Sequence, residues 1–193
     1  MKIWLIRHGM TAGNQKKRYI GTTDEPLCDE GRRLLRSSPA LPEVEELYVS
    51  PLQRCIETAQ ILYPGMKERI IEDFRECDFG DFENKNYAEL SDNEDYQRWV
   101  ESNATLPFPH GESREEFQER CVHAFEALMR DLSDRNIRDA AIVVHGGTIM
   151  SILSKFGKPE RAYFDFSVGN GDGFLLEWDG RQCTYQQIDA AER

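Results

Sequence analysis

Two arginines, two histidines and one glutamate stand where apolar or strand-length segments of this chain end. They are Arg7, His8, Arg54, Glu76 and His145. In a parallel sheet, ligands bind beyond the carboxyl ends of the strands, where helix N-termini also point. Packing alone does not require a basic cluster at this edge. We therefore expect these five side chains to form one site at the rim of a sheet.

The chemistry that suits such a rim is phosphoryl transfer. The transition state of a phosphate ester spreads negative charge over the equatorial oxygens, so that fixed positive donors stabilise it. Arginine binds phosphate oxygens through two parallel hydrogen bonds and stays protonated. In this interpretation a neutral His8 attacks phosphorus through one ring nitrogen, while a backbone carbonyl holds the other. Glu76, flanked by Phe74 and Phe79, is the best placed acid for the leaving alkoxide.

The segment after His145 would add to the same site. Gly146 and Gly147 follow this histidine directly and open the predicted helix TIMSIL, residues 148–153. Backbone N–H groups and the positive end of a helix bind anions, and glycine lets the backbone approach closely. A single arginine or histidine in such a place is more often structural than catalytic. The prediction therefore depends on four segments pointing to one place.

Short apolar runs alternate with segments of helical length. Residues 3–6 and 140–144 are continuously apolar, as in strands that are covered on both faces, and 47–50 and 69–74 are less regular strand candidates. Helices are expected at 29–37, 52–63, 95–102, 113–132 and 148–156. This alternation predicts an α/β fold with helices packed on a largely parallel sheet. Asp179-Gly180 predicts a hairpin that adds an antiparallel element.

Two helix starts can be read from the capping residues. Ser50 is the expected N-cap of the helix that carries Arg54 in its first turn, with Pro51 at the first helical position. Ser113-Arg114-Glu115-Glu116 has the pattern of a capping box. On the helix that follows, His123 points away from the apolar stripe, which indicates a solvated surface histidine.

Composition limits the class of protein. The 193 residues suit one domain, and 39% hydrophobic and 31% charged residues are typical of a soluble globular chain. The net charge of -11 argues against binding to nucleic acid, which requires a basic surface. No apolar stretch approaches the roughly 20 residues of a membrane span, and the start MKIWLIRHG does not look like a signal peptide. Five scattered cysteines without a C-x-x-C pair indicate reduced thiols, and we expect a cytoplasmic protein.

The sequence lacks the motifs that mark three other classes of enzyme. The chain has no G-x-S-x-G turn of a serine esterase and no H-E-x-x-H pattern of a metal enzyme. A dinucleotide-binding enzyme would carry G-x-G-x-x-G after the first strand, whereas GNGDG, residues 169–173, lies in a late turn.

Five sequence blocks resemble one family. LIRHGMTAGN, residues 5–14, is similar to the R-H-G-x-T-x-x-N signature of the histidine phosphatase superfamily, also called the phosphoglycerate mutase-like family. Four later blocks resemble those of the family in order and spacing: SPLQRCIETA, FRECDFGDFE, PHGES and HGGTI. The likeness spans nearly the whole chain.

The resemblance implies a role for each matching residue. It implies that His8 forms a phosphohistidine, that Glu76 is the proton donor, and that the phosphoryl group is bound by Arg7, Arg54 and His145. It also implies that the phosphate site is lined by Asn14, by the backbone around Gly21 and Thr22, and by Gly146. The implied fold is a three-layer α/β/α sandwich, formed by residues 1–193 as a single domain with a small cap at about 77–112. No metal or organic cofactor is expected.

Within the superfamily, the chain most resembles the short bacterial alpha-ribazole phosphatase-like branch, through FRECDFGDFENKNYAEL at residues 74–90. The expected function is metal-independent hydrolysis of a small phosphate ester, with alpha-ribazole phosphate as one candidate. Phosphoglycerate mutase-type transfer and a catalytically silent phosphate-binding module are the alternatives. Cys28 stands where a hydroxyl residue is frequent, and Asn84 where glycine is frequent. Both departures concern the substrate, which the sequence leaves open together with the oligomeric state.

Overall fold

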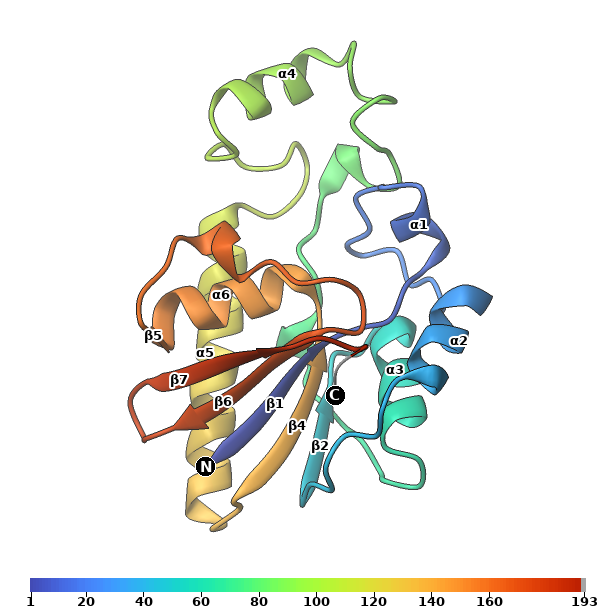
Figure 1. The fold of residues 1–193 in the computed structure, drawn as a ribbon. Coiled ribbons are helices and arrows are strands. Elements are labelled where there is room, and N and C mark those ends of the chain that lie inside the picture. Colours follow the sequence, from blue (N-terminus) through green and yellow to red (C-terminus); the bar gives the residue numbers. More distant parts are fainter. Residues whose placement is uncertain (192–193) are drawn as a thin grey trace.

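A seven-stranded sheet forms the middle of the computed structural model, which describes residues 1–191 (Figure 1). The strands lie in the order β3-β2-β4-β1-β6-β7-β5. The first four of these are parallel, β6 is antiparallel to both β1 and β7, and β5 pairs in parallel with β7. Their bounds are Lys2–Arg7 (β1), Glu46–Val49 (β2), Arg69–Ile70 (β3), Asp139–Val144 (β4), Gly157–Lys158 (β5), Gly173–Trp178 (β6) and Cys183–Ile188 (β7). The predicted C-terminal hairpin, β6 to β7, is confirmed.

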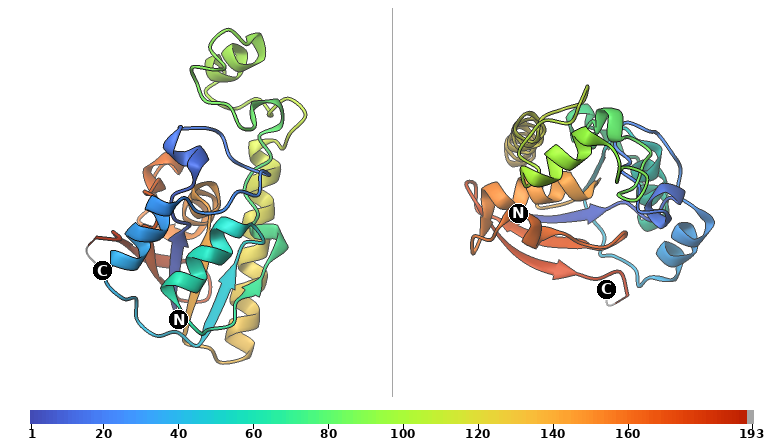
Figure 2. Two further views of the ribbon diagram at one scale, coloured as in Figure 1. Left: turned by 90° about the vertical axis from the view of Figure 1, so that its right-hand side faces the viewer. Right: turned by 90° about the horizontal axis from the view of Figure 1, so that it is seen from above.

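Helices cover both faces of this sheet, as Figure 2 shows from the side and from above. The α-helices are Ala12–Gln15 (α1), Asp29–Ser37 (α2), Gln53–Leu62 (α3), Glu94–Glu101 (α4), Arg114–Asp134 (α5) and Gly146–Phe156 (α6). Short 3₁₀ turns occupy Glu72–Phe74, Gly80–Phe82 and Tyr163–Phe166. No helix within residues 1–191 combines the length and the apolar character needed to cross a membrane.

The central strand β4 shows why the helices form two layers. Ala140, Ile142 and Val144 lie in one buried cluster with residues of α5 and α6. Ala141 and Val143 lie in a second cluster with residues of α3. Successive side chains of a strand point to opposite faces, so a fully apolar strand serves both layers. The expected three-layer α/β/α sandwich is confirmed.

Two local predictions were wrong. The strand expected at 69–74 ends at Ile70, because β3 is an edge strand paired only through two residues, and Phe74 turns into the core below α5. The helix α3 begins at Gln53 with Leu52 as its N-cap, so Ser50 does not cap it. The Ser50 hydroxyl instead forms a 2.7 Å hydrogen bond with His145 Nε2. The Asp24 carboxylate takes over part of the capping and accepts from the Gln53 N–H.

Other local predictions hold. The capping box between Ser113 and Glu116 is present at the start of α5, and His123 is exposed. All five cysteines are free thiols.

Residues 77–112, here called the 77–112 segment, rise away from the sheet toward the top of Figure 1 and carry α4. Two backbone hydrogen bonds close its base, from the N–H of Glu112 to the Asp78 carbonyl and from the N–H of Asp81 to the Pro109 carbonyl, both at 2.9 Å. Gly80 has a φ of 51°, and a Cβ there would lie 2.0 Å from the Pro109 carbonyl oxygen. Only glycine therefore permits this closure.

Candidate active site

His8 lies directly after β1 and is 4% exposed. Its Nδ1 is 2.7 Å from the Gly9 carbonyl oxygen, which can only accept, so Nδ1 carries the proton. Nε2 therefore keeps its lone pair. Burial lowers the pKa of His8 well below its ordinary value, and the charges of Arg54 and Arg7 lower it further. The ring is a neutral base at neutral pH.

Arg54 is fully buried in the first turn of α3. Its Nη atoms donate to three backbone carbonyls, at 2.8 Å to Thr23, 2.9 Å to Gly21 and 3.3 Å to Ile20. Its Nε donates at 3.4 Å to His145 Nδ1. The guanidinium is thus held between the loop before α2 and the start of α6, and its plane cannot turn.

His145 is the fully buried residue that precedes α6. Because Nδ1 accepts from Arg54, Nε2 carries the proton and donates to the Ser50 hydroxyl. Its ring centroid lies 5.2 Å from that of His8. Burial lowers the pKa of His145 well below its ordinary value, and Arg54 lowers it further. Both histidines are therefore uncharged beside two arginines.

Arg7, the last residue of β1, reaches over the N-terminus of α6. Its Nη1 donates to the Val168 carbonyl at 2.6 Å, and a Cβ added to Gly146 would lie 3.6 Å from its Nε. This Nε is buried and finds no hydrogen-bond partner within residues 1–191. A buried donor without a partner is costly, which makes it available to an anion beside His8.

Glu76 follows the 3₁₀ turn at 72–74 and faces the same space. The N–H of Cys77 donates to its Oε1 at 3.0 Å, and a Cβ on Gly147 would lie 2.6 Å from that oxygen. Burial raises the pKa of Glu76, against the opposing effects of the Cys77 N–H and of the Arg54 and Arg7 charges. All five residues that the sequence placed at the rim, here called the rim cluster, therefore lie together.

The four residues expected to line the phosphate site differ in their surroundings. Gly146 lies against Arg7, and Asn14 forms a capping box with Thr11 in α1. Thr22 is exposed. Gly21 departs from the expectation, because its N–H donates to Glu83 and its carbonyl accepts from Arg54. Gly21 thus supports the arginine rather than offering a free N–H.

Sequence reasoning missed two residues that organise this site. Glu83 Oε1 accepts from the N–H groups of Gly21 at 2.8 Å and Thr23 at 2.9 Å, the loop whose carbonyls hold Arg54. Asn170, in the GNGDG turn, donates through Nδ2 to the His8 carbonyl at 3.2 Å and to Asn14 Oδ1 at 3.0 Å. An asparagine between glycines is the signal in the sequence, but rejecting GNGDG as a dinucleotide motif assigns this turn no other role.

The departures at Cys28 and Asn84 have local explanations. Cys28 is the N-cap of α2, where its Sγ accepts from the Gly31 N–H at 3.3 Å. Asn84 has a φ of 60°, a conformation that asparagine tolerates better than most residues other than glycine. Its Nδ2 donates to the Thr23 hydroxyl at 2.9 Å.

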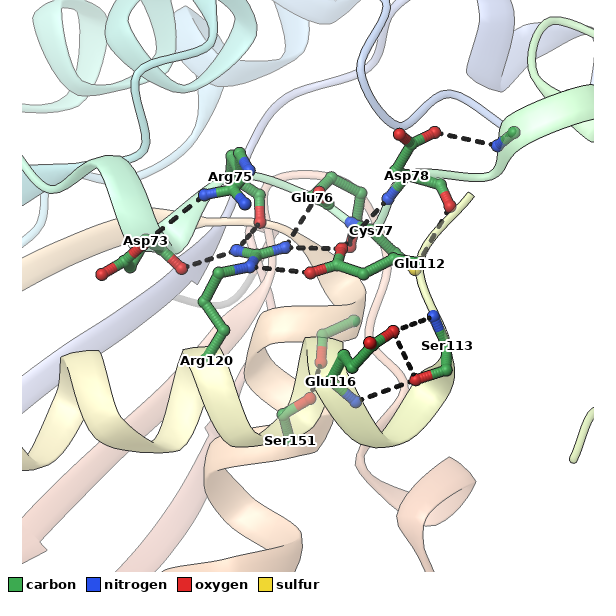
Figure 3. A network of polar contacts seen from close by, with 12 residues as sticks. Asp73, Arg75, Glu76, Cys77, Asp78, Glu112, Ser113, Glu116, Arg120 and Ser151 are labelled. Carbon is green, nitrogen blue, oxygen red and sulfur yellow. Dashed lines mark hydrogen bonds and ion pairs between the residues drawn. The ribbon is translucent and has the colours of Figure 1, made fainter. Parts of the chain in front are cut away.

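An ion pair holds the backbone around Glu76 (Figure 3). Arg120, from α5, donates through Nη1 to the carbonyls of Asp73 at 2.7 Å and Arg75 at 3.0 Å, and through Nη2 to that of Glu76 at 3.5 Å. Glu112 accepts from Arg120 Nε at 2.9 Å and from Nη2 at 2.7 Å. Glu112 also accepts from the Asp78 N–H at 3.3 Å.

A pocket of 240 Å³ opens beside Glu76. Most of its wall is aromatic, and its seven rings belong to Tyr19, Phe79, Trp99, Phe108, Phe117, Tyr163 and Phe164. Arg114 also lines it, with its guanidinium carbon 4.3 Å from the centre of the Tyr163 ring. A second, polar opening is lined by Arg7, Asn14, Lys17 and Asn170. Within residues 1–191, no three His, Cys, Asp or Glu side chains gather as they would around a metal ion.

The sequence profile of the histidine phosphatase superfamily (branch 1) matches residues 3–190, and the chain belongs to this superfamily. It is 27% identical to the adenosylcobalamin/alpha-ribazole phosphatase of Escherichia coli (strain K12), over 98% of this chain and 96% of that protein. It is 30% identical to phosphoglycerate mutase-like protein 4 of Arabidopsis thaliana, over 96% of this chain and 83% of the relative.

Solved structures agree with this assignment. The phosphoglycerate mutase of Thermus thermophilus superposes with a TM-score of 0.75 at 28% identity, over 98% of this chain and 99% of that one. The alpha-ribazole phosphatase of Shigella flexneri has the same fold, with a TM-score of 0.79 at 24% identity, over 100% of this chain and 96% of that one. The resemblance inferred from the motifs is confirmed, and the chain is a phosphatase of the superfamily.

Proposed function

We propose that this phosphatase hydrolyses phosphate monoesters through a covalent phosphohistidine on His8. The observation that carries the proposal is the hydrogen bond from Nδ1 to the Gly9 carbonyl, which leaves Nε2 free and aimed by a fixed tautomer. Nε2 forms a bond to phosphorus while the bond to the leaving oxygen breaks. Arg7 binds a phosphoryl oxygen through its unpartnered Nε. Arg54 and His145 bind the other oxygens in exchange for the hydrogen bonds that they make to one another and to Ser50. The positive end of α6 at Gly146 adds to them.

Glu76 acts as general acid in the first step and as general base in the second. Its raised pKa keeps a proton available for the leaving alkoxide. The same carboxylate then takes a proton from the water that attacks the phosphohistidine, which releases phosphate and restores His8. No step uses a metal or an organic cofactor.

The aromatic pocket supports an ester whose alcohol carries a flat, apolar group. It adjoins Glu76, the side on which the alcohol leaves, and the 77–112 segment supplies Phe79, Trp99 and Phe108 to its wall. We assign this segment the role of a cap on a single domain. Alpha-ribazole phosphate, with an aromatic base, is the candidate that fits such a wall and the names of the relatives. A phosphoglycerate would meet one guanidinium, that of Arg114, and otherwise mostly rings.

The mechanism is tested by trapping the intermediate. Wild-type protein mixed with ³²P-labelled substrate and quenched in alkali should retain label that acid releases, whereas His8→Asn should retain none and lose at least about a thousandfold in turnover. Activity should persist in excess chelator. Near-wild-type turnover by the variant, or a wild type without trapped label, would refute the nucleophile, and loss with chelator would refute metal independence.

The acid is tested by the leaving group. Glu76→Gln should lower kcat/KM, which reports only the steps up to formation of the phosphohistidine, by roughly 10²–10⁴-fold for 2-phenylethyl phosphate, because its alkoxide needs a proton. It should lower kcat/KM for 4-nitrophenyl phosphate far less, because nitrophenolate leaves without one. An equal loss of kcat/KM on both esters would contradict the assignment. The substrate itself is sought by turnover across alpha-ribazole phosphate, phosphoglycerates, sugar phosphates and phosphoamino acids.

A further inference from the structure

We infer that the Arg120–Glu112 ion pair is a positioning device for the general acid: it fixes the backbone that aims the Glu76 carboxyl at the leaving oxygen. The inference rests on the proposed function of Glu76. Neither residue belongs to the rim cluster or to the aromatic pocket, so both act through Glu76 rather than on the substrate.

The segment that carries Glu76 needs such support because it lies outside the sheet. The strand β3 ends at Ile70, and within residues 1–191 no strand pairs with residues 75–79. The Arg120 guanidinium substitutes for one, since it bonds to the carbonyls of Asp73, Arg75 and Glu76 in succession (Figure 3). A planar fork that bonds three carbonyls within residues 73–76 fixes the direction of the chain as well as its place.

Glu112 completes the device from the other side. Its carboxylate holds Arg120 with two hydrogen bonds and accepts from the N–H of Asp78, two residues beyond Glu76. Hydrogen bonds from Arg120 and Glu112 therefore hold the backbone on both sides of Glu76, at residues 73–75 and at Asp78. The pair is largely buried, with 11% of the Arg120 side chain and 16% of the Glu112 side chain exposed. Solvent consequently screens it little.

A merely structural ion pair would have a different signature. Loss of a buried partner lowers stability whatever the substrate, and a general loosening of the site slows all esters alike. Misplacement of an acid by about 1 Å costs up to a hundredfold, but only where the proton is needed. The ratio of kcat/KM between the two esters therefore separates positioning of the acid from general support.

The experiment uses Arg120→Met, Arg120→Lys and Glu112→Gln in the full chain. Arg135→Met is the matched control, because Arg135 follows α5 at its opposite end and pairs with Glu46 and Asp131. Arg120→Met should lower kcat/KM for 2-phenylethyl phosphate about ten- to a hundredfold and for 4-nitrophenyl phosphate less than about threefold. Arg120→Lys should restore part of the difference, and the control should leave the ratio unchanged. If Arg120→Met does not fold, Glu112→Gln carries the test with a shift in the same direction.

A double mutant distinguishes an action through Glu76 from an independent effect of Arg120. Because Arg120 acts through Glu76, adding Arg120→Met to Glu76→Gln should change kcat/KM for 2-phenylethyl phosphate by less than about twofold. Equal slowing of both esters by Arg120→Met, or full additivity in the double mutant, would overturn the inference. Failure of Glu76→Gln itself to distinguish the esters would instead refute the acid of the proposed function.

Discussion

The rim cluster and the 77–112 segment face the same space, but different forces hold them. Arg54 in the rim cluster is fixed by hydrogen bonds to three carbonyls and to His145. The 77–112 segment is held largely by rings, such as the stacked pair Tyr96 and Trp99 and the edge contact of Phe82 with Phe108. Hydrogen bonds are directional and lose strength steeply when bent, whereas ring packing tolerates other shapes. The chemistry is therefore fixed and the shape of the pocket adjustable.

Arg54→Lys should break the rim cluster most severely. A lysine cannot donate to His145 and to the loop carbonyls at once, because it lacks the planar fork. We expect kcat with 4-nitrophenyl phosphate to fall by roughly 10²–10³-fold, as for a lost oxyanion donor. A loss below about tenfold would show that charge alone, without the fork, supports catalysis.

The buried histidines should make stability depend on pH. The folded pKa values of His8 and His145 lie well below the ordinary 6.5, so unfolding takes up protons on the acid side. The stability that these two neutral histidines contribute is fully present above about pH 6.5 and falls as the pH drops below it, by on the order of 1 kcal/mol for each histidine between pH 7.5 and 5.5. Urea unfolding at the two pH values measures the loss, and His8→Asn should remove one share of it.

Glu76 changes the stability with pH in the opposite direction to the two histidines. Its pKa is raised in the folded state, so its stabilising contribution is present at low pH and is lost as pH rises through the folded pKa. Glu76→Gln should therefore steepen the fall of stability toward pH 5.5. If neither His8→Asn nor Glu76→Gln changes how the free energy of unfolding depends on pH, the pKa shifts assigned to these two side chains are contradicted.

The 77–112 segment should respond in binding rather than in chemistry. Trp99→Leu shortens one wall of the aromatic pocket and should raise KM for 2-phenylethyl phosphate about tenfold. The KM of glycerol 2-phosphate, which has no ring to place there, should change little. If kcat falls instead for both esters, the 77–112 segment also affects the chemistry of the rim cluster, and the separation of the two regions is contradicted.

The smallest effect, on stability alone, is expected at Cys28, which lies outside both the rim cluster and the 77–112 segment. Sulfur is a weak acceptor, and Cys28→Ser would give α2 a hydroxyl cap for the Gly31 N–H. The free energy of unfolding should rise by about 0.5–1 kcal/mol with activity unchanged. Thermal and urea unfolding measure it, with Cys183→Ser as a control that removes a buried thiol without adding a cap.

Much of the fold and most of the rim cluster could be predicted from local sequence. Apolar runs such as 140–144 specify strands covered on both faces, and residues directly after strands meet at one edge of a sheet. The Ser113 capping box is likewise complete within four residues. These signals work because the interacting groups are neighbours in the chain.

The rest could not be predicted because it depends on distant partners. Glu83 is 62 residues from Gly21, and Arg120 is 44 residues from Glu76. Ser50 shows the same limit, since its hydroxyl fits the local capping pattern but bonds with His145, 95 residues away. Where a polar side chain has a local and a remote partner, the sequence reveals only the local one.

The closed base of the 77–112 segment makes it exchangeable. Because Asp78 and Glu112 already meet, a replacement loop of any length begins and ends at fixed points, and doubling its length adds only about 0.6 kcal/mol of closure entropy. Divergence or engineering can thus replace the whole 77–112 segment by another loop while His8, Arg7 and Arg54 stay in place. One scaffold can in this way acquire new specificities without re-evolving its reaction.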